Sequence, residues 1–160
     1  MENKYYGVYQ GIVTNVNDPE KRGRIKCKIP EVLADSETES AWCDPCVPVA
    51  YDGGGDFCVP PIDEGVWIAF LSGDANRPVY FGGWWQEADT PIAGNYTNLK
   101  DFRIISYNGA SIVMKDGVIY INVDSGTYDL RIQDGSITIN GNLTVNGKIN
   151  ATGSIHGSNI

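Results

Sequence analysis

A strict alternation near the end of the chain limits the possible folds more than any other feature. Residues 135–155 read GSITINGNLTVNGKINATGSI, in which each odd position is apolar or glycine and each even position is polar. This period of two is typical of a β-strand with one buried face. A single straight strand of this length would extend roughly 70 Å. Glycine also returns at every sixth residue, so we expect the chain to bend there, where the missing Cβ permits tight backbone turns.

The apolar side of this repeat needs partners that one copy of the chain does not supply. Four six-residue repeats would make little more than one coil of a single-chain β-helix, and stacked architectures need about three repeats to cover one another. Three identical chains wound together would instead bring the apolar rows to a common axis and pair the strand edges. The alternative is a set of ordinary antiparallel hairpins folded back on the rest of the chain. Such a trimer would be a triangular tube, with each chain forming one side. Its predicted core is Ile137, Ile139, Leu143, Val145 and Ile149, and the glycines predicted at its corners are Gly135, Gly141, Gly147 and Gly153.

The whole chain is predicted to be all-β and to contain two structured regions. Its 19 glycines and 8 prolines favour turns, and no convincing amphipathic helix is present. Residues 1–87 indicate five or six short strands with long loops, which suits a small closed barrel of the OB type. Residues 88–99 are polar and are predicted to be a linker. Residues 100–160 are predicted to form an intertwined trimeric β-helix, beginning with a broader meander whose turns are Asn108-Gly109, Asp116-Gly117, Ser125-Gly126 and Asp134-Gly135.

Charge and targeting signals exclude several functions. The formal net charge is −8 at pH 7 and the sequence pI is near 4.5. Nucleic-acid binding needs a basic surface for the phosphates, so we expect no nucleic-acid partner. The N-terminus has neither an apolar signal core nor a long hydrophobic span, and we expect synthesis and folding in the cytosol.

Four cysteines and one histidine are the candidate metal ligands. Cys43 and Cys46 have the spacing of a zinc knuckle or a redox pair, and Cys27 and Cys58 could complete a four-thiolate site. Strand-like runs on both sides favour buried structural thiols instead. Three copies of His156 could bind one metal ion on a trimer axis. That position is even in the alternation, which favours a solvated histidine and no cofactor.

Neither a catalytic site nor a binding site stands out in the predicted barrel. With its only histidine far from the barrel, the chain cannot assemble a Ser-His-Asp or Cys-His arrangement there. Carboxylate pairs such as Asp63 with Glu64, or Asp52 with Asp56, are typical of solvated loops. We therefore predict that the protein is not an enzyme. Glycan binding is the alternative function, because aromatic side chains could stack on sugars; the candidates are Tyr5, Tyr6, Tyr9, Tyr51, Trp84 and Trp85. Trp67, Trp84 and Trp85 could instead fill the barrel or its junction with the C-terminal region.

An ordered set of motifs in the first half resembles a known family. The motifs are GIVTNVNDPEKRGRIKCKIP (11–30), AWCDPCVPVA (41–50), PPIDEGVWIAF (60–70) and SGDANRPVYFGGWW (72–85). They are similar to the OB-fold domain of the phage baseplate assembly protein V family, the central spike proteins of contractile phage tails, tailocins and related injection systems. The glycine-punctuated C-terminus is similar to that family's trimeric β-helix.

The resemblance implies a structural role. It implies a homotrimer whose OB domain docks on the tail hub protein and whose β-helix points at the target cell envelope, puncturing it mechanically as part of a virion or contractile particle. Some family members insert a lysozyme-like domain, for which residues 88–99 leave no room. Others hold an iron ion with an H-x-H tip, whereas the tip here reads GSIHGSNI and has His156 alone. A separate tip-capping protein is a further expected partner.

Overall fold

The computed structural model of the chain describes residues 3–33, 38–86, 100, 102–124, 126–128, 130, 132 and 135–152. The chain divides into two compact units, residues 1–100 and 101–160. The described residues form β-strands and one short 3₁₀ turn, which confirms the all-β prediction. The predicted linker at 88–99 lies outside the described residues.

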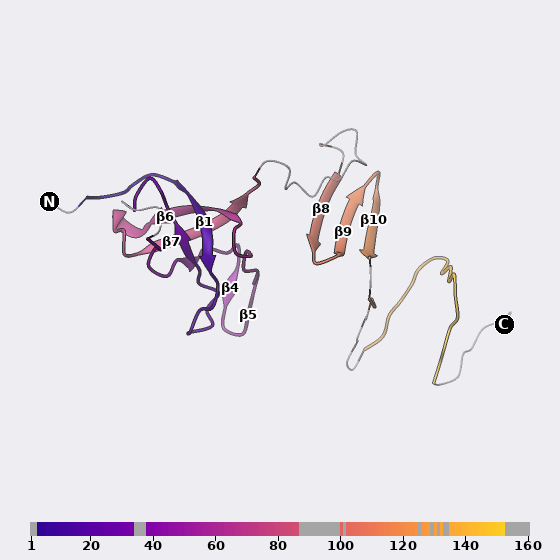
Figure 1. The fold of residues 1–160 in the computed structure, drawn as a ribbon. Helices are drawn as coiled ribbons and strands as arrows, with labels where there is room; N and C mark the ends of the chain where they lie inside the picture. Colours follow the sequence, from indigo (N-terminus) through magenta and orange to yellow (C-terminus); the bar gives the residue numbers. More distant parts are fainter. Residues whose placement is uncertain are drawn as a thin grey trace. The chain divides into compact units, whose positions relative to one another are not determined.

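The first unit is a curled five-stranded sheet (Figure 1), with strand order β2-β1-β6-β7-β3. All neighbours are antiparallel except β3, which runs parallel to β7. Ile25 and Cys43 form an antiparallel bridge just outside β2 and β3, and this bridge joins the two edges of the sheet into a small barrel. The OB-like form predicted for this region is confirmed. The strands are β1 (Tyr9–Asn15), β2 (Lys26–Lys28), β3 (Asp44–Pro45), β6 (Gly65–Phe70) and β7 (Pro78–Trp84).

Strand β6 lies at the centre of the sheet, as its apolar residues on both faces predict. Its side chains at Val66, Ile68 and Phe70 are buried in the barrel core, whereas Trp67 lies on the opposite face and is only half-buried. In the sequence, Trp67, Ala69 and Leu71 alternate with the core residues, which predicts a strand that continues through Leu71, but Leu71 is exposed. The strand ends at Phe70 because a 3₁₀ turn (Leu71–Gly73) follows, with φ at 55° for Ser72 and 72° for Gly73. The core comprises Val13, Ile25, Cys27, Ile29, Cys43, Val66, Ile68, Phe70 and Tyr80.

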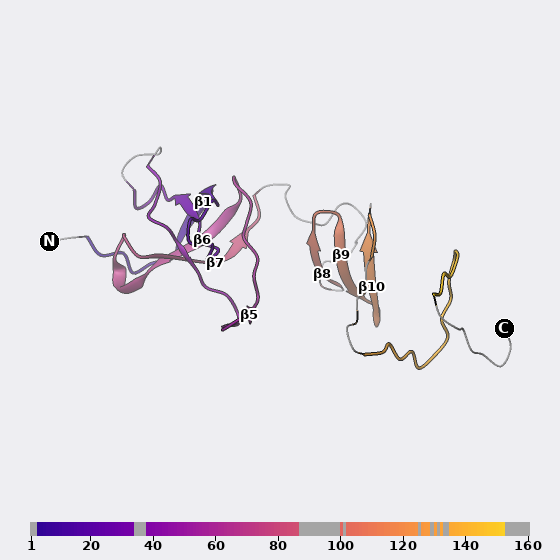
Figure 2. The same ribbon diagram turned by 90° about the horizontal axis from the view of Figure 1, so that it is seen from below.

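A second, two-stranded sheet extends from this barrel. It consists of β4 (Ala50–Tyr51) and β5 (Gly54–Gly55), which pair as a short antiparallel hairpin whose strand residues are all exposed. Figures 1 and 2 both show this hairpin leaving the curled sheet. The motif at 41–50 contains β3 and the first residue of β4, which are separated by residues 46–49.

The second unit is a three-stranded antiparallel meander in the order β10-β9-β8. Its strands are β8 (Phe102–Tyr107), β9 (Ala110–Lys115) and β10 (Val118–Val123). The turns are Asn108-Gly109, with φ at 45° and 79°, and Asp116-Gly117, with φ at 51° and 75°. Positive φ at both residues is the requirement of the tight hairpin turn that such dipeptides favour. The first two predicted hairpin turns are thus confirmed.

The described residues after β10 form no strand in a single copy of the chain. Within 135–152 the chain bends at Asn140-Gly141 and again at Asn146-Gly147. These bends fall at two of the glycines where the sequence predicts them. The trimeric β-helix itself stays a prediction.

Candidate functional site

The meander of the second unit carries an exposed apolar face. The registers place Ile105 opposite Ile112 and Ile112 opposite Ile121, so these three side chains form a row across the sheet. Five large apolar side chains on this face have exposed fractions between 40% and 67%. Contiguous exposed apolar surface of this kind marks an interaction site. The sequence interpretation used this region only for its turns and missed the face, although its alternating apolar residues were a usable signal. The meander face is defined by Ile105, Tyr107, Ile112, Ile119 and Ile121.

The predicted axial row after the meander is equally exposed. Its five side chains, Ile137, Ile139, Leu143, Val145 and Ile149, have exposed fractions between 42% and 67%. A Cβ added to Gly141 or Gly147 would meet no heavy atom within 4 Å. One copy of the chain therefore leaves this row without a core to pack against, and the axial assignment stays a prediction. Two other predicted residues, Gly153 and His156, lie outside the described residues.

Asp18 organises the long turn between β1 and β2. Its carboxylate accepts hydrogen bonds from the backbone N–H of Glu20 at 3.0 Å and of Arg22 at 2.7 Å. It also accepts two from the Arg24 guanidinium, at 3.1 Å from Nε and 2.6 Å from Nη2. The Asp18 side chain is 4% exposed. This concentration of donors explains why the segment NDPEKRGR folds into one fixed turn.

The same contacts set the electrostatics of the turn. The Arg24 side chain, together with the backbone N–H donors, holds the pKa of Asp18 well below its ordinary range. In return, Asp18 raises the pKa of the Arg24 guanidinium. Arg24 and Lys26 also lie over the Trp42 ring, with their cationic groups 5.7 and 5.5 Å from the ring centroid. The turn and strand β2 are thereby tied to the segment before β3.

The structure separates the four cysteines into two pairs. Cys27 and Cys43 are fully buried in the barrel core, whereas Cys46 and Cys58 are exposed. A hydrogen bond with the Cys43 thiol and burial raise the pKa of the Cys27 thiol. The four-thiolate site is not assembled. Across the described residues, no group of three or more histidine, cysteine or acidic side chains could hold a metal ion.

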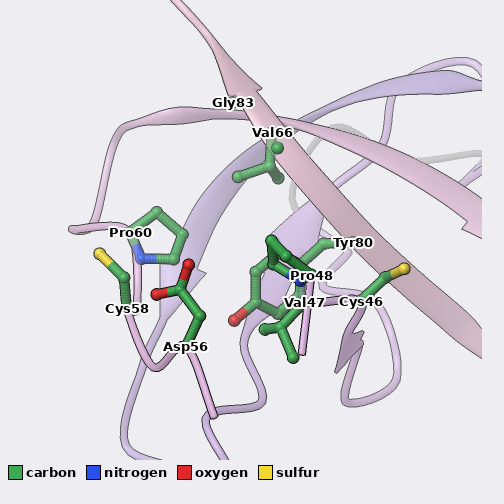
Figure 3. A pocket seen from close by; sticks show the side chains of 10 residues that line it. Cys46, Val47, Pro48, Asp56, Cys58, Pro60, Val66, Tyr80 and Gly83 are labelled. Carbon is green, nitrogen blue, oxygen red and sulfur yellow. The ribbon is translucent and has the colours of Figure 1, made fainter. Parts of the chain in front are cut away.

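One pocket lies beside the barrel, with a volume of about 260 Å³. Figure 3 shows Pro60, Cys58 and Asp56 on one side and Tyr80, Pro48, Val47 and Cys46 on the other, with Val66 and Gly83 at its end. The thiols of Cys46 and Cys58 thus lie on opposite sides of the pocket. The sequence interpretation did not find this pocket, because no local motif encodes it.

The aromatic residues proposed for glycan stacking do not share one surface. The rings of Tyr5 and Tyr9 pack against Phe70, with centroids 5.8 and 5.5 Å away. Trp84 packs on Trp67 with ring centroids 6.4 Å apart. Three of the six residues therefore support the barrel. The exposed remainder, Tyr6, Tyr51 and Trp85, comes from the N-terminal segment, from β4 and from the residue after β7.

The barrel closure, the Asp18 turn and the central strand β6 together define a small β-barrel domain of the OB type. Residues 9–85 match the family described as the type VI secretion system/phage-baseplate injector OB domain. Residues 9–85 therefore form a domain of that family, and the resemblance found in the sequence is confirmed for this part of the chain. A comparison with curated proteins found no match. In the described part of the chain, no helix has the length and apolar character needed to cross a bilayer.

Proposed function

We propose that this protein is the central spike of a contractile phage tail or of a related injection particle. The family match supports a structural, tail-spike-related role. Proteins that carry such a domain are components of virions or similar particles. In this proposal residues 100–160 of three chains form the shaft. The barrel docks on a tail hub protein, and the shaft punctures the target envelope mechanically.

The observation that carries the proposal is the apolar surface that a single chain leaves uncovered after its injector-type barrel. The meander face and the axial row together expose ten large apolar side chains. Fully burying an aliphatic side chain stabilises a protein by about 1.5–3 kcal/mol. Covering the exposed halves of the five axial side chains in three chains would contribute on the order of 15 kcal/mol before ordering costs. A cyclic homo-oligomer such as a trimer buries identical rows around one axis.

A shaft of this type suits puncture because of its stiffness. In such a tube every strand edge is paired between chains and the apolar side chains are internal, so bending requires breaking many contacts together. The outward residues of the repeat are serine, threonine, asparagine and lysine, which keep the outer surface hydrated. Mechanical puncture needs no catalytic group.

Native mass measurement by light scattering tests this proposal. The full chain is expected to be a trimer, and a chain ending at Leu99 is expected to be a folded monomer, because the first unit has its own core. A monomeric full chain would refute the proposed spike. A truncated chain that remains trimeric would move the assembly surface to the barrel.

A further inference from the structure

One edge of the barrel sheet is only partly covered. Strand β3 lies beside β7 but pairs only at Asp44 with Val79 and at Pro45 with Tyr80. The last contact along this edge is the Cys46 N–H, which donates to the Tyr80 carbonyl at 2.8 Å. Among the described residues, no strand pairs with this side of β7 from Phe81 to Trp84. An unpaired strand edge is a template for adding another strand.

Glycines make this edge accessible. Gly82 has φ at 62° and lies where the register between β6 and β7 shifts, opposite the step from Val66 to Ile68. A Cβ placed on Gly82 would meet nothing within 4 Å. Gly83 pairs with Val66 on the other side, toward β6. Without side chains at these two positions, another backbone can approach β7 closely. The open stretch is short, so it suits a short extended segment.

The pocket opens along the same stretch of β7, because Tyr80, Gly82 and Gly83 all line it. Its remaining walls are mostly apolar and include Val47, Pro48, Pro60 and Val66 (Figure 3). The Tyr80 hydroxyl already donates to the Gly23 carbonyl at 2.8 Å, so this side chain contributes its ring. An apolar pocket next to an open strand edge is the combination used for peptide recognition by strand addition, in which backbone bonds give affinity and the pocket selects a side chain.

The charge beside the pocket indicates which residue type an incoming segment should carry next to the apolar side chain that enters the pocket. Asp56 lines the wall, and its backbone N–H donates to the Val49 carbonyl at 3.0 Å. No described residue pairs with the Asp56 carboxylate. Asp52 adds a second negative charge on the same hairpin without lining the pocket. A basic side chain on the incoming segment would complement this charge.

We propose that the open edge of β7 and the adjoining pocket form a strand-addition site for an extended peptide segment of a partner protein. The segment places an apolar side chain in the pocket and a neighbouring lysine or arginine beside Asp56. This site lies wholly within the first unit and does not depend on trimer formation or on the spike function.

Selection from a library of random heptapeptides on the full chain tests the site. Enriched peptides are expected to combine an aliphatic or proline residue with a nearby basic residue. Asp56→Lys should weaken their binding roughly threefold to tenfold, measured by fluorescence anisotropy, and Asp52→Lys is the matched control with little effect. Methylation of alternate peptide nitrogens should abolish binding, and the peptide should slow hydrogen exchange from Phe81 to Trp84.

Each of the other outcomes would overturn the proposal. Failure to enrich any peptide would refute the site. Equal effects of Asp56→Lys and Asp52→Lys on binding would refute the proposed role of Asp56 in selecting a basic residue. Binding that survives backbone methylation would indicate a pocket for side chains without strand addition. Exchange protection of Phe81–Trp84 that rises with protein concentration, in the absence of peptide, would assign the edge to a second copy of this chain.

Discussion

Replacing Leu143 with aspartate tests the proposed trimer axis most directly. Leu143 is 67% exposed in a single chain, so assembly would newly bury most of its surface and contribute about 1–2 kcal/mol per chain. The substitution loses that contribution and also places three carboxylates together in a dry interior, where burying each ion costs several kcal/mol. The expected loss is on the order of 10 kcal/mol per trimer, or about seven orders of magnitude in the association constant.

The matched control is Asn142→Asp, which adds the same charge one residue earlier. Asn142 has the outward parity of the alternation, so this variant should remain trimeric. Light scattering at micromolar concentration measures both masses, and partial reassembly of Leu143→Asp is expected at a pH low enough to protonate the new carboxyl groups. A trimeric Leu143→Asp, or a dissociated Asn142→Asp, would show that the inward and outward assignment is wrong.

Three further predictions concern the barrel. The lowered pKa of Asp18 means that its stabilising contribution is present above the ordinary carboxyl pKa of 3.8 and disappears as the pH falls toward the lower folded value. Urea midpoints of wild type and Asp18→Asn should therefore differ at pH 7 and converge at low pH, and a constant difference would contradict this account. Tyr80→Phe leaves the Gly23 carbonyl without its 2.8 Å donor and should lower the free energy of unfolding by about 1–3 kcal/mol; an unchanged urea midpoint would argue against this bond. A thiol reagent should modify two cysteines rapidly in the folded protein and the other two only after unfolding, with mass spectrometry identifying the rapid pair as Cys46 and Cys58; rapid labelling of a buried cysteine would argue against the core.

Local patterns predicted much of the fold. The apolar runs on both faces of β6 placed it at the centre of the sheet, and the Asn-Gly and Asp-Gly dipeptides located both meander turns. These signals succeed because the geometry of a strand or a tight turn depends on adjacent residues. The end of β6 was wrong by one residue at Leu71, because the apolar alternation does not reveal that Ser72 takes a positive φ.

The surfaces that depend on distant residues were harder to predict. Cys43 and Cys46 lie three positions apart, yet one is in the core and the other is exposed, because the chain passes between them from the closing bridge through β3. The pocket depends on β3 ending at Pro45 and on residues 46–48 and 56–60 contributing to its walls together with β7. Neither fact is encoded in a short motif, so the candidate binding site appears only when the tertiary structure is known.

The paired strands of the barrel are farther apart in the sequence than those of the meander, so the two units should fold at different rates. Closing the barrel requires β1 to find β6, with Tyr9 opposite Ile68, and such distant pairings slow folding. The meander joins each strand to the next through a two-residue turn, and hairpins of this type form within roughly 1–10 μs. Its apolar face would therefore form before chains meet. If the proposed trimer forms, the encounter between chains becomes the slow step at low expression, and the yield of assembled protein should rise more steeply than in proportion to chain concentration.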